Sequence, residues 1–229
     1  MKIHLCNDNK EFPYLYVDEW YTPEEEKLIW KELDFYTNPF AMCRANDEKN
    51  KRAQLEREEG KKDKGSAIEA WHFPVDNLSA PITWNNREVS HILRLKLLKM
   101  DSIEDTIKKM GTLFEPFWET NYDLHYVSYY EDGDYYKAHR DGMSDDGYTH
   151  KMTTITWFHR IPKAFTGGDF KLNDIDVTIE SKHNRMLMFP NYYAHEVLPL
   201  AMNNKNYLVM GGEGRYSIIN LYYLYDESN

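Results

Sequence analysis

The sequence predicts an α+β protein in which N-terminal helices support a C-terminal sheet structure of the sandwich, barrel or jelly-roll kind. Two observations carry this prediction. Before about residue 121, the clearest periodic segments repeat apolar residues every three or four positions, as amphipathic helices do. From about residue 122 the period becomes two, and β-branched and aromatic residues gather in short runs between turn sequences such as EDGD, SDDG and TGG.

A single domain over 1–229 is expected, because this length suits one hydrophobic core. Hydrophobic residues make up 41% of the chain and charged residues 29%, which is ordinary for a folded globular protein. We expect residues 1–121 to form the helical support region and residues 122–229 the sheet core.

The first elements of the support region are a short strand and a well-capped helix. The strand is expected over 13–17, in PYLYV. The helix follows with Thr22 as the N-cap, Pro23 at the first helical position and Glu25 closing a capping box, while Ile29 and other apolar residues repeat along one face.

The rest of the support region combines helices with a charged segment. Helices are expected over 87–100 and 102–118, where apolar residues recur at core-facing intervals. Residues 46–65 carry many charges of both signs and almost no apolar side chains, so they must be solvated. This segment is either a plain surface excursion or a flap that closes over a substrate.

Eight short runs predict the strands of the sheet core. They are rich in valine, isoleucine, threonine and aromatic residues, and turn residues separate them. The runs are 124–130, 134–141, 151–158, 168–172, 177–181, 185–190, 195–200 and 215–225.

Charge and cysteine content exclude several classes of protein. A net charge of -10 and a pI near 5.4 disfavour general nucleic-acid binding, since the field repels phosphate. The two cysteines, Cys6 and Cys43, are too few for a disulfide framework and are expected to be free thiols. There is no run of about 18 apolar residues and no signal-type N-terminus, so we expect a cytoplasmic protein without a membrane segment.

Three residues form a candidate metal site. Side chains two residues apart on a strand project from one face, so in YYKAHRD the side chains of His139 and Asp141 lie together while Arg140 points away. His195, just after the strand RMLMF, is the candidate third ligand. Two histidines and one carboxylate leave open positions on a divalent metal, as non-haem Fe(II) oxygenases require. The alternative is that His139 is a surface residue and Asp141 caps a turn.

A second constellation follows in GRYSIINLYY. Arg215 and Ser217 share one face of an otherwise apolar strand, and a guanidinium beside a hydroxyl is suited to binding a carboxylate. A buried arginine without an anion is unfavourable. The alternative is therefore that Arg215 lies at an exposed strand end or against a protein carboxylate.

Residues 122–225 resemble the 2-oxoglutarate- and Fe(II)-dependent oxygenases, and within them the prolyl 4-hydroxylase-like branch. Five segments carry the resemblance in family order: YYEDGDYYKAHRD, TTITWF, TGGDFKL, NRMLMFPNYYAHEV and GRYSIINLYY. The resemblance implies a distorted double-stranded β-helix, a form of jelly roll, supported by the N-terminal helices. It also implies that His139, Asp141 and His195 are the iron ligands.

The resemblance extends to the co-substrate. Arg215 would pair with the distal carboxylate of 2-oxoglutarate, and Tyr130 and Ser217 would be its neighbours. Gly167 and Gly168 look like the family's glycine turn. Lys205 is a rival carboxylate binder, because some prolyl hydroxylases use a lysine at about that distance from the second histidine.

The implied reaction is hydroxylation of a substrate by O2 with conversion of 2-oxoglutarate to succinate and CO2, and ascorbate is a candidate reductant. A prolyl residue of a peptide or protein is the expected substrate, with a free amino acid or small metabolite as the alternative. The aromatic side chains of Tyr135, Tyr136 and Trp157 are candidates for lining the substrate pocket, although aromatic residues on strands more often belong to a core.

Two further alternatives are disfavoured. The branch that demethylates nucleic-acid bases has a second arginine six residues after the co-substrate arginine, where this chain has Leu221, and the acidic charge also argues against it. A non-catalytic jelly-roll binding module would not need all three presumed ligands together with Arg215.

Overall fold

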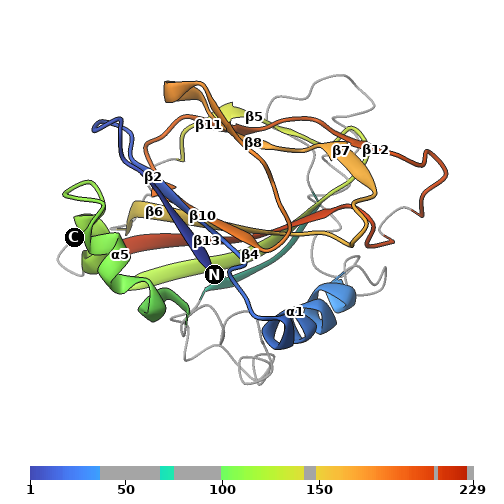
Figure 1. Ribbon diagram of the computed structural model, residues 1–229, viewed down its shortest axis with the longest axis horizontal. Coiled ribbons are helices and arrows are strands. Elements are labelled where there is room, and N and C mark those ends of the chain that lie inside the picture. The colour runs from blue at the N-terminus through green and yellow to red at the C-terminus, as the bar shows by residue number, and fades with distance from the viewer. Residues whose placement is uncertain (37–67, 75–98, 142–147, 209–210, 226–229) are drawn as a thin grey trace.

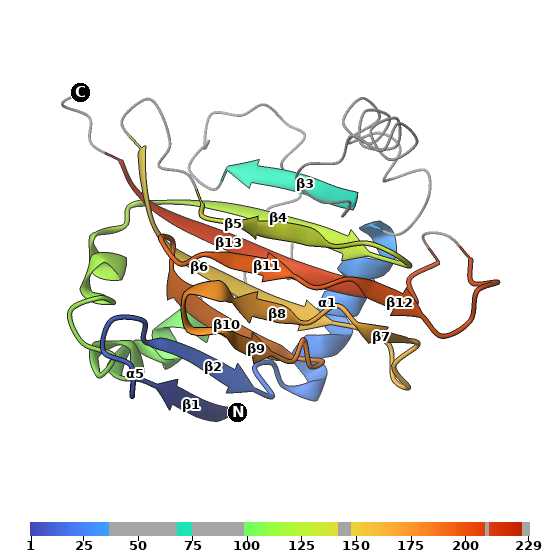
Figure 2. The ribbon, with the colours of Figure 1, turned by 90° about the horizontal axis from the view of Figure 1, so that it is seen from above.

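Two β-sheets face each other in the protein, and helix α1 (Pro23–Tyr36) covers the outer face of the larger sheet (Figure 1). The computed structural model describes residues 1–36, 68–74, 99–141, 148–208 and 211–225. Seen from above, strands of the smaller sheet lie over those of the larger one (Figure 2).

The larger sheet has seven strands within the described residues, in the order β1-β2-β10-β6-β13-β4-β3. All of its neighbouring strands are antiparallel. Its strands are β1 (Lys2–Cys6), β2 (Tyr14–Asp18), β3 (Ile68–Pro74), β4 (Tyr122–Tyr130), β6 (Tyr148–Phe158), β10 (Arg185–Pro190) and β13 (Arg215–Tyr225).

The smaller sheet has the order β5-β11-β8-β9, and a separate two-stranded pair joins β12 to β7. The short 3-10 helix η3 (Asn173–Ile175) connects β8 to β9. The strands are β5 (Tyr136–His139), β7 (Phe165–Gly167), β8 (Phe170–Leu172), β9 (Val177–Ile179), β11 (His195–Val197) and β12 (Leu200–Met202). Each of the eight runs predicted from the sequence overlaps a strand, and the facing antiparallel sheets are those of a jelly roll.

The N-terminal helix begins as its sequence predicts. The backbone N–H of Glu25 donates to the Thr22 hydroxyl at 3.3 Å, and the Thr22 N–H donates to the Glu25 carboxylate at 2.7 Å. This reciprocal pair is the predicted capping box. Ile29 and Leu33 are fully buried against the larger sheet, so the apolar face predicted for the helix is confirmed.

The predicted helix over 102–118 is wrong in extent. Residues 99–102 are helical, and α5 (Glu104–Lys108) follows, but Gly111 then adopts a positive φ of 83° that an α-helix does not contain. Pro116 begins no new α-helix and instead lies in the 3-10 helix η2 (Glu115–Glu119). The glycine and the proline therefore divide one periodic segment into two short helices.

The N-terminal region is also less helical than expected, because β1, β2 and β3 all join the larger sheet. The strand predicted over 13–17 is confirmed as β2, which pairs with β10 and so extends the sheet. The expectation of a helical support region is therefore correct only in part. Segment 46–65, most of the helix predicted over 87–100, and Cys43 lie outside the described residues.

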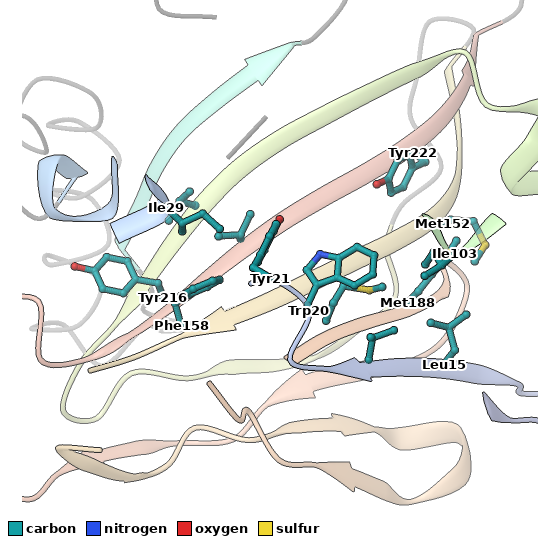
Figure 3. Close-up of a cluster of buried hydrophobic side chains, with 14 of the residues drawn as sticks. Leu15, Trp20, Tyr21, Ile29, Ile103, Met152, Phe158, Met188, Tyr216 and Tyr222 are labelled. Carbon is teal, nitrogen blue, oxygen red and sulfur yellow. The ribbon is translucent and has the colours of Figure 1, made fainter. Parts of the chain in front are cut away.

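Two hydrophobic cores lie on opposite faces of the larger sheet. The first fills the space between this sheet and the helices, where Ile29 of α1 packs near Phe158 and Tyr216 (Figure 3). The second fills the interior between the two sheets, and it includes Trp157 and Phe170. No helix within the described part of the chain is long and apolar enough to cross a membrane.

Strand β13 shows how alternation separates the two cores. Tyr216, Ile218 and Tyr222 belong to the core beneath the helices, whereas Ile219 and Leu221 pack in the core between the sheets. Arg215 and Ser217 have the same parity as Ile219 and therefore face the interior between the sheets. This is the face that carries the candidate site.

Candidate metal centre

The structure brings His139, Asp141 and His195 together at one edge of the smaller sheet. Strands β5 and β11 are antiparallel neighbours, and His139 is the register partner of His195. One potential ligand atom from each of the three residues lies within 4.8 Å of the others. Asp141 Oδ1 is 3.6 Å from His139 Nε2 and 3.7 Å from His195 Nε2. One carboxylate oxygen thus faces both imidazoles.

Backbone contacts determine which ring nitrogen of each histidine faces the site. His139 Nδ1 lies 2.8 Å from the carbonyl oxygen of Lys137, and His195 Nδ1 lies 2.9 Å from that of Tyr193. A carbonyl oxygen only accepts hydrogen bonds, so each Nδ1 carries the proton and donates it. In the neutral imidazole the lone pair then lies on Nε2, the nitrogen that faces Asp141, and this is the tautomer that binds a metal through Nε2.

The charge states of the buried groups also favour a cation. Burial alone would raise the pKa of Asp141, but the adjacent imidazoles of His139, His195 and His150 together hold that pKa below its ordinary value. Burial lowers the pKa of His195. At neutral pH Asp141 is therefore a carboxylate and His195 a neutral imidazole, and a divalent cation requires both forms.

Aromatic rings surround the imidazoles on the buried side. The Phe170 ring stacks on His195 with centroids 5.3 Å apart, and Phe189 meets it edge-on at 5.2 Å. His139 is 31% exposed at its side chain, against 7% for His195, and the half-buried Tyr136 ring packs on it at 4.4 Å. The site consequently opens to solvent beside His139 and Tyr136.

A salt bridge on the outer side connects the two ligand-bearing segments. Arg140 points away from the triad, as strand alternation predicts, and its guanidinium donates to both oxygens of Asp174 at 3.0 and 2.6 Å. The same carboxylate accepts a hydrogen bond of 2.7 Å from the backbone N–H of Ala194. Arg140 lies between two of the candidate ligands and Ala194 precedes the third, so Asp174 holds both segments in place.

Replacing Asp174 by asparagine is expected to lower the free energy of unfolding at pH 7 by about 1–2 kcal/mol, because a charged hydrogen-bond acceptor becomes neutral. Burial alone would raise the pKa of Asp174, but hydrogen bonds from Arg140 and from the Ala194 N–H hold it below its ordinary value. The charge therefore stabilises the fold above the unfolded-state pKa of about 3.9, and this contribution disappears as the pH falls through the lower folded-state pKa.

Denaturant unfolding of wild type and Asp174→Asn at pH 7 and near pH 3 measures this effect, and the difference between them should shrink in acid. A difference that stays constant with pH would show that the carboxylate charge contributes nothing.

Arg215 is fully buried between the sheets and lacks an ion-pair partner among the described residues. Its Nη1 donates to the carbonyl oxygen of Gly168, and its guanidinium lies 4.2 Å from the centroid of the Tyr130 ring. Its Nε and Nη2 have no hydrogen-bond partner among these residues. Burial lowers the pKa of Arg215 to about 10, so it is still a cation at neutral pH. Asp169 and Asp134 favour the charged form from a distance, but a buried guanidinium with two free donors and no ion-pair partner among the described residues is suited to an anionic ligand.

The other predicted residues fall into three groups. Tyr130, Ser217 and Trp157 are buried on the interior face, and Trp157 Nε1 has no hydrogen-bond partner among the described residues. Tyr135 and Tyr136 are half-buried, and the Tyr136 ring packs on His139. Lys205 is 67% exposed, and its Nζ pairs with Asp132 at 2.5 Å.

The predicted glycine turn adjoins Arg215. Gly167 and Gly168 have positive φ values of 67° and 71°, and a Cβ on Gly167 would lie 2.3 Å from the carbonyl oxygen of Pro199. Only glycine allows this close approach. The turn presents the Gly168 carbonyl to the guanidinium, so it helps to orient Arg215.

The sequence prediction missed Asp174, His150 and Thr153. Asp174 lies in the predicted turn sequence NDID, and only its contacts reveal its importance. Thr153 donates to Asp141 Oδ2 at 3.1 Å, and His150 lies beside it in the buried interior. Strand alternation could have placed Thr153 on the interior face, but not His150.

Comparisons with known proteins agree with this geometry. Residues 124–223 match the model of the 2OG-Fe(II) oxygenase superfamily. An uncharacterized PKHD-type hydroxylase of Synechocystis sp. is 26% identical over 106 residues, which cover 41% of this chain. The match covers 35% of that relative, so the chain spans about a third of its length.

Solved structures show the fold. A prolyl-4-hydroxylase of Pseudomonas putida matches with a TM-score of 0.51 and 14% identity, over 95% of each chain. A prolyl hydroxylase of Trichoplax adhaerens, in complex with a hypoxia inducible factor peptide fragment, matches with a TM-score of 0.50 and 14% identity, over 92% of this chain and 83% of that one. Residues 124–223 are therefore similar to the 2OG-Fe(II) oxygenase superfamily, and the fold is similar to that of the solved prolyl hydroxylases.

Proposed function

We propose that this protein is an Fe(II)- and 2-oxoglutarate-dependent dioxygenase that hydroxylates a prolyl residue of a peptide or protein. The observation that carries this proposal is that a buried arginine with unpartnered donors shares its interior with the His139, Asp141 and His195 cluster. The first feature supports a carboxylate-bearing co-substrate and the second supports a metal.

The donor set fits Fe(II). Two imidazole nitrogens and one carboxylate oxygen converge, and each imidazole is held by a backbone carbonyl. Bound Fe(II) would supply the oxidative decarboxylation of 2-oxoglutarate by O2, which yields succinate, CO2 and a hydroxylated substrate. The residues of the chain would bind the metal, orient the co-substrate and exclude water.

The interior donors fit the distal carboxylate of 2-oxoglutarate. Arg215 would bind it through Nε and Nη2, and Tyr130 and Ser217 would lie beside it. Trp157 is the register partner of Ser217, and its unpartnered indole N–H makes it a candidate donor to the same carboxylate as well as a candidate pocket-lining residue. Lys205 is a weaker candidate for this role because it is exposed and paired with Asp132.

Two observations support a prolyl substrate: the similarity to prolyl hydroxylases and the aromatic ring beside the triad. The P. putida and T. adhaerens structures that share this fold are prolyl hydroxylases. The solvent-facing side of the triad lies beside Tyr136, whose ring is suited to packing against a proline ring. A cytoplasmic location and ascorbate as the reductant remain predictions.

Incubation with Fe(II), 2-oxoglutarate and O2 is expected to convert a proline-containing peptide to a product heavier by about 16 Da, with succinate formed in equal amount. A panel of proline-containing peptides, the same peptides with alanine for proline, and free amino acids would be compared by mass spectrometry. The alanine peptides are the matched control. Turnover confined to free amino acids would overturn the polypeptide substrate and leave the oxygenase chemistry standing.

A further inference from the structure

Strand β6 contains an irregularity next to Thr153, the residue that contacts Asp141 of the candidate metal centre. On β13, the consecutive residues Tyr222 and Tyr223 pair with Met152 and His150, so Lys151 is an extra, unpaired residue on β6. This is a β-bulge, and bulges change the direction in which side chains point. Met152 is buried in the core beneath the helices, whereas Thr153 contacts Asp141 on the interior face.

The bulge brings His150 to the same side as Thr153. In a regular strand, residues three apart project from opposite faces. Here His150 Nε2 lies 3.1 Å from Thr153 Oγ1, and His150 Nδ1 lies 3.8 Å from Asp141 Oδ2. Both side chains are buried to the same degree, with 2% exposure, and the Tyr223 ring stacks on His150 at 4.8 Å.

The contacts define a directed chain of hydrogen bonds. His150 Nε2 is 2.9 Å from the backbone carbonyl of Met152, which only accepts, so this nitrogen carries a proton. The same N–H also faces Thr153 Oγ1, and the Thr153 hydroxyl donates its own proton to Asp141 Oδ2 at 3.1 Å. His150 therefore orients the hydroxyl, and the hydroxyl holds one oxygen of Asp141.

We infer that Thr153, oriented by His150 across the bulge, is the positioning residue that turns Asp141 so that only Oδ1 faces the metal. This inference rests on the proposed function. Oδ1 is the oxygen that lies 3.6 and 3.7 Å from the two histidine Nε2 atoms. Ligation by one oxygen leaves three positions of a six-coordinate ion open, and a chelating carboxylate would take a position that the co-substrate or O2 needs.

The test compares three threonine variants by titration of the purified full chain with Mn(II), and by the absorption spectrum with Co(II). Thr153→Val removes the hydroxyl and keeps the shape, and we expect it to weaken metal binding by about 10-fold or more and to change the Co(II) spectrum. Thr153→Ser restores the hydroxyl and should bind within about 3-fold of wild type. Thr156→Val is the matched control, since Thr156 is equally buried on the same strand but lies on the opposite face.

His150 variants test the orienting step. His150→Phe keeps a ring against Tyr223 but loses the donor, and His150→Gln keeps an N–H donor. We expect His150→Phe to weaken Mn(II) binding less than Thr153→Val does, and His150→Gln to recover most of the loss. The double variant His150→Phe, Thr153→Val should bind no more weakly than Thr153→Val alone, because His150 acts through the hydroxyl.

The outcomes separate this inference from the proposed function. If Thr153→Val binds Mn(II) as wild type does while His139→Ala does not, the positioning role is wrong and the metal centre stands. Equal losses in Thr153→Val and Thr156→Val would indicate general destabilisation and would also overturn it. If wild type binds neither Mn(II) nor Co(II), the proposed function and this inference both fail.

Discussion

Replacing Arg215 by alanine is expected to raise the concentration of 2-oxoglutarate required for binding by two to three decades. Removing one partner of a buried charged pair typically costs about 3–5 kcal/mol of free energy. Each tenfold change in affinity corresponds to about 1.4 kcal/mol. The affinity for Mn(II) alone should change little, because the guanidinium contacts Gly168 and Tyr130 and none of the three candidate ligands. Calorimetric titration of the Mn(II)-loaded protein with 2-oxoglutarate measures the effect.

The unfolding temperature gives a second, independent test of the role of Arg215. In the absence of co-substrate its cation is buried without a carboxylate partner among the described residues, so Arg215→Met should unfold at the same temperature as wild type or higher. Addition of 2-oxoglutarate to protein already saturated with Mn(II) should stabilise wild type further, since a ligand that binds only the native state raises its unfolding temperature. The methionine variant should show no such increase.

Lys205→Ala is the matched control for the carboxylate-binding role. Lys205 is an exposed cation paired with Asp132, and its loss should leave 2-oxoglutarate binding nearly unchanged. A large loss in Lys205→Ala together with a mild effect of Arg215→Ala would transfer the role to Lys205.

Replacing either His139 or His195 by alanine is expected to abolish the weak visible absorption band that Fe(II) gives with a chelating 2-oxo acid under anaerobic conditions. Each variant removes one of the three proposed ligands. The loss of metal affinity should exceed the roughly 10–100-fold typical of changes to residues that only support a ligand. Succinate production should fall with the band, and Mn(II) should no longer raise the unfolding temperature.

His4→Ala is the control for the histidine variants. His4 also lies on a strand beside a carboxylate, with its Nε2 3.6 Å from Asp18 Oδ2, but it belongs to no metal-type cluster within the described residues. This variant should keep both the band and the activity. Retention of the band in His139→Ala and in His195→Ala would show that the ligands are wrongly assigned.

Local rules were sufficient for much of the site. The i, i+2 spacing placed His139 beside Asp141 and Arg215 beside Ser217, because successive side chains alternate across any strand. The capping box at Thr22 and Glu25 is equally local, and the structure confirms it. These features depend only on residues close together in the chain.

Local rules failed where pairing between distant segments decided the outcome. The N-terminal strand β1 was not foreseen, because its place in the sheet depends on its pairing with β2. A regular strand would have placed His150 beneath the helices with Met152, and only the pairing of β6 with β13 reveals the bulge that redirects it.

By itself, the sequence predicted the jelly-roll sheets, the residue types of the candidate metal site and the order in which they occur, since these follow from short-range periodicity and spacing. Only the tertiary structure decided that His195 is the register partner of His139, that Asp174 holds both ligand segments, and that Arg215 is buried without a carboxylate partner among the described residues. The physical reason is that strand register and burial arise from hydrogen bonding and packing between segments far apart in the chain, which no local pattern specifies.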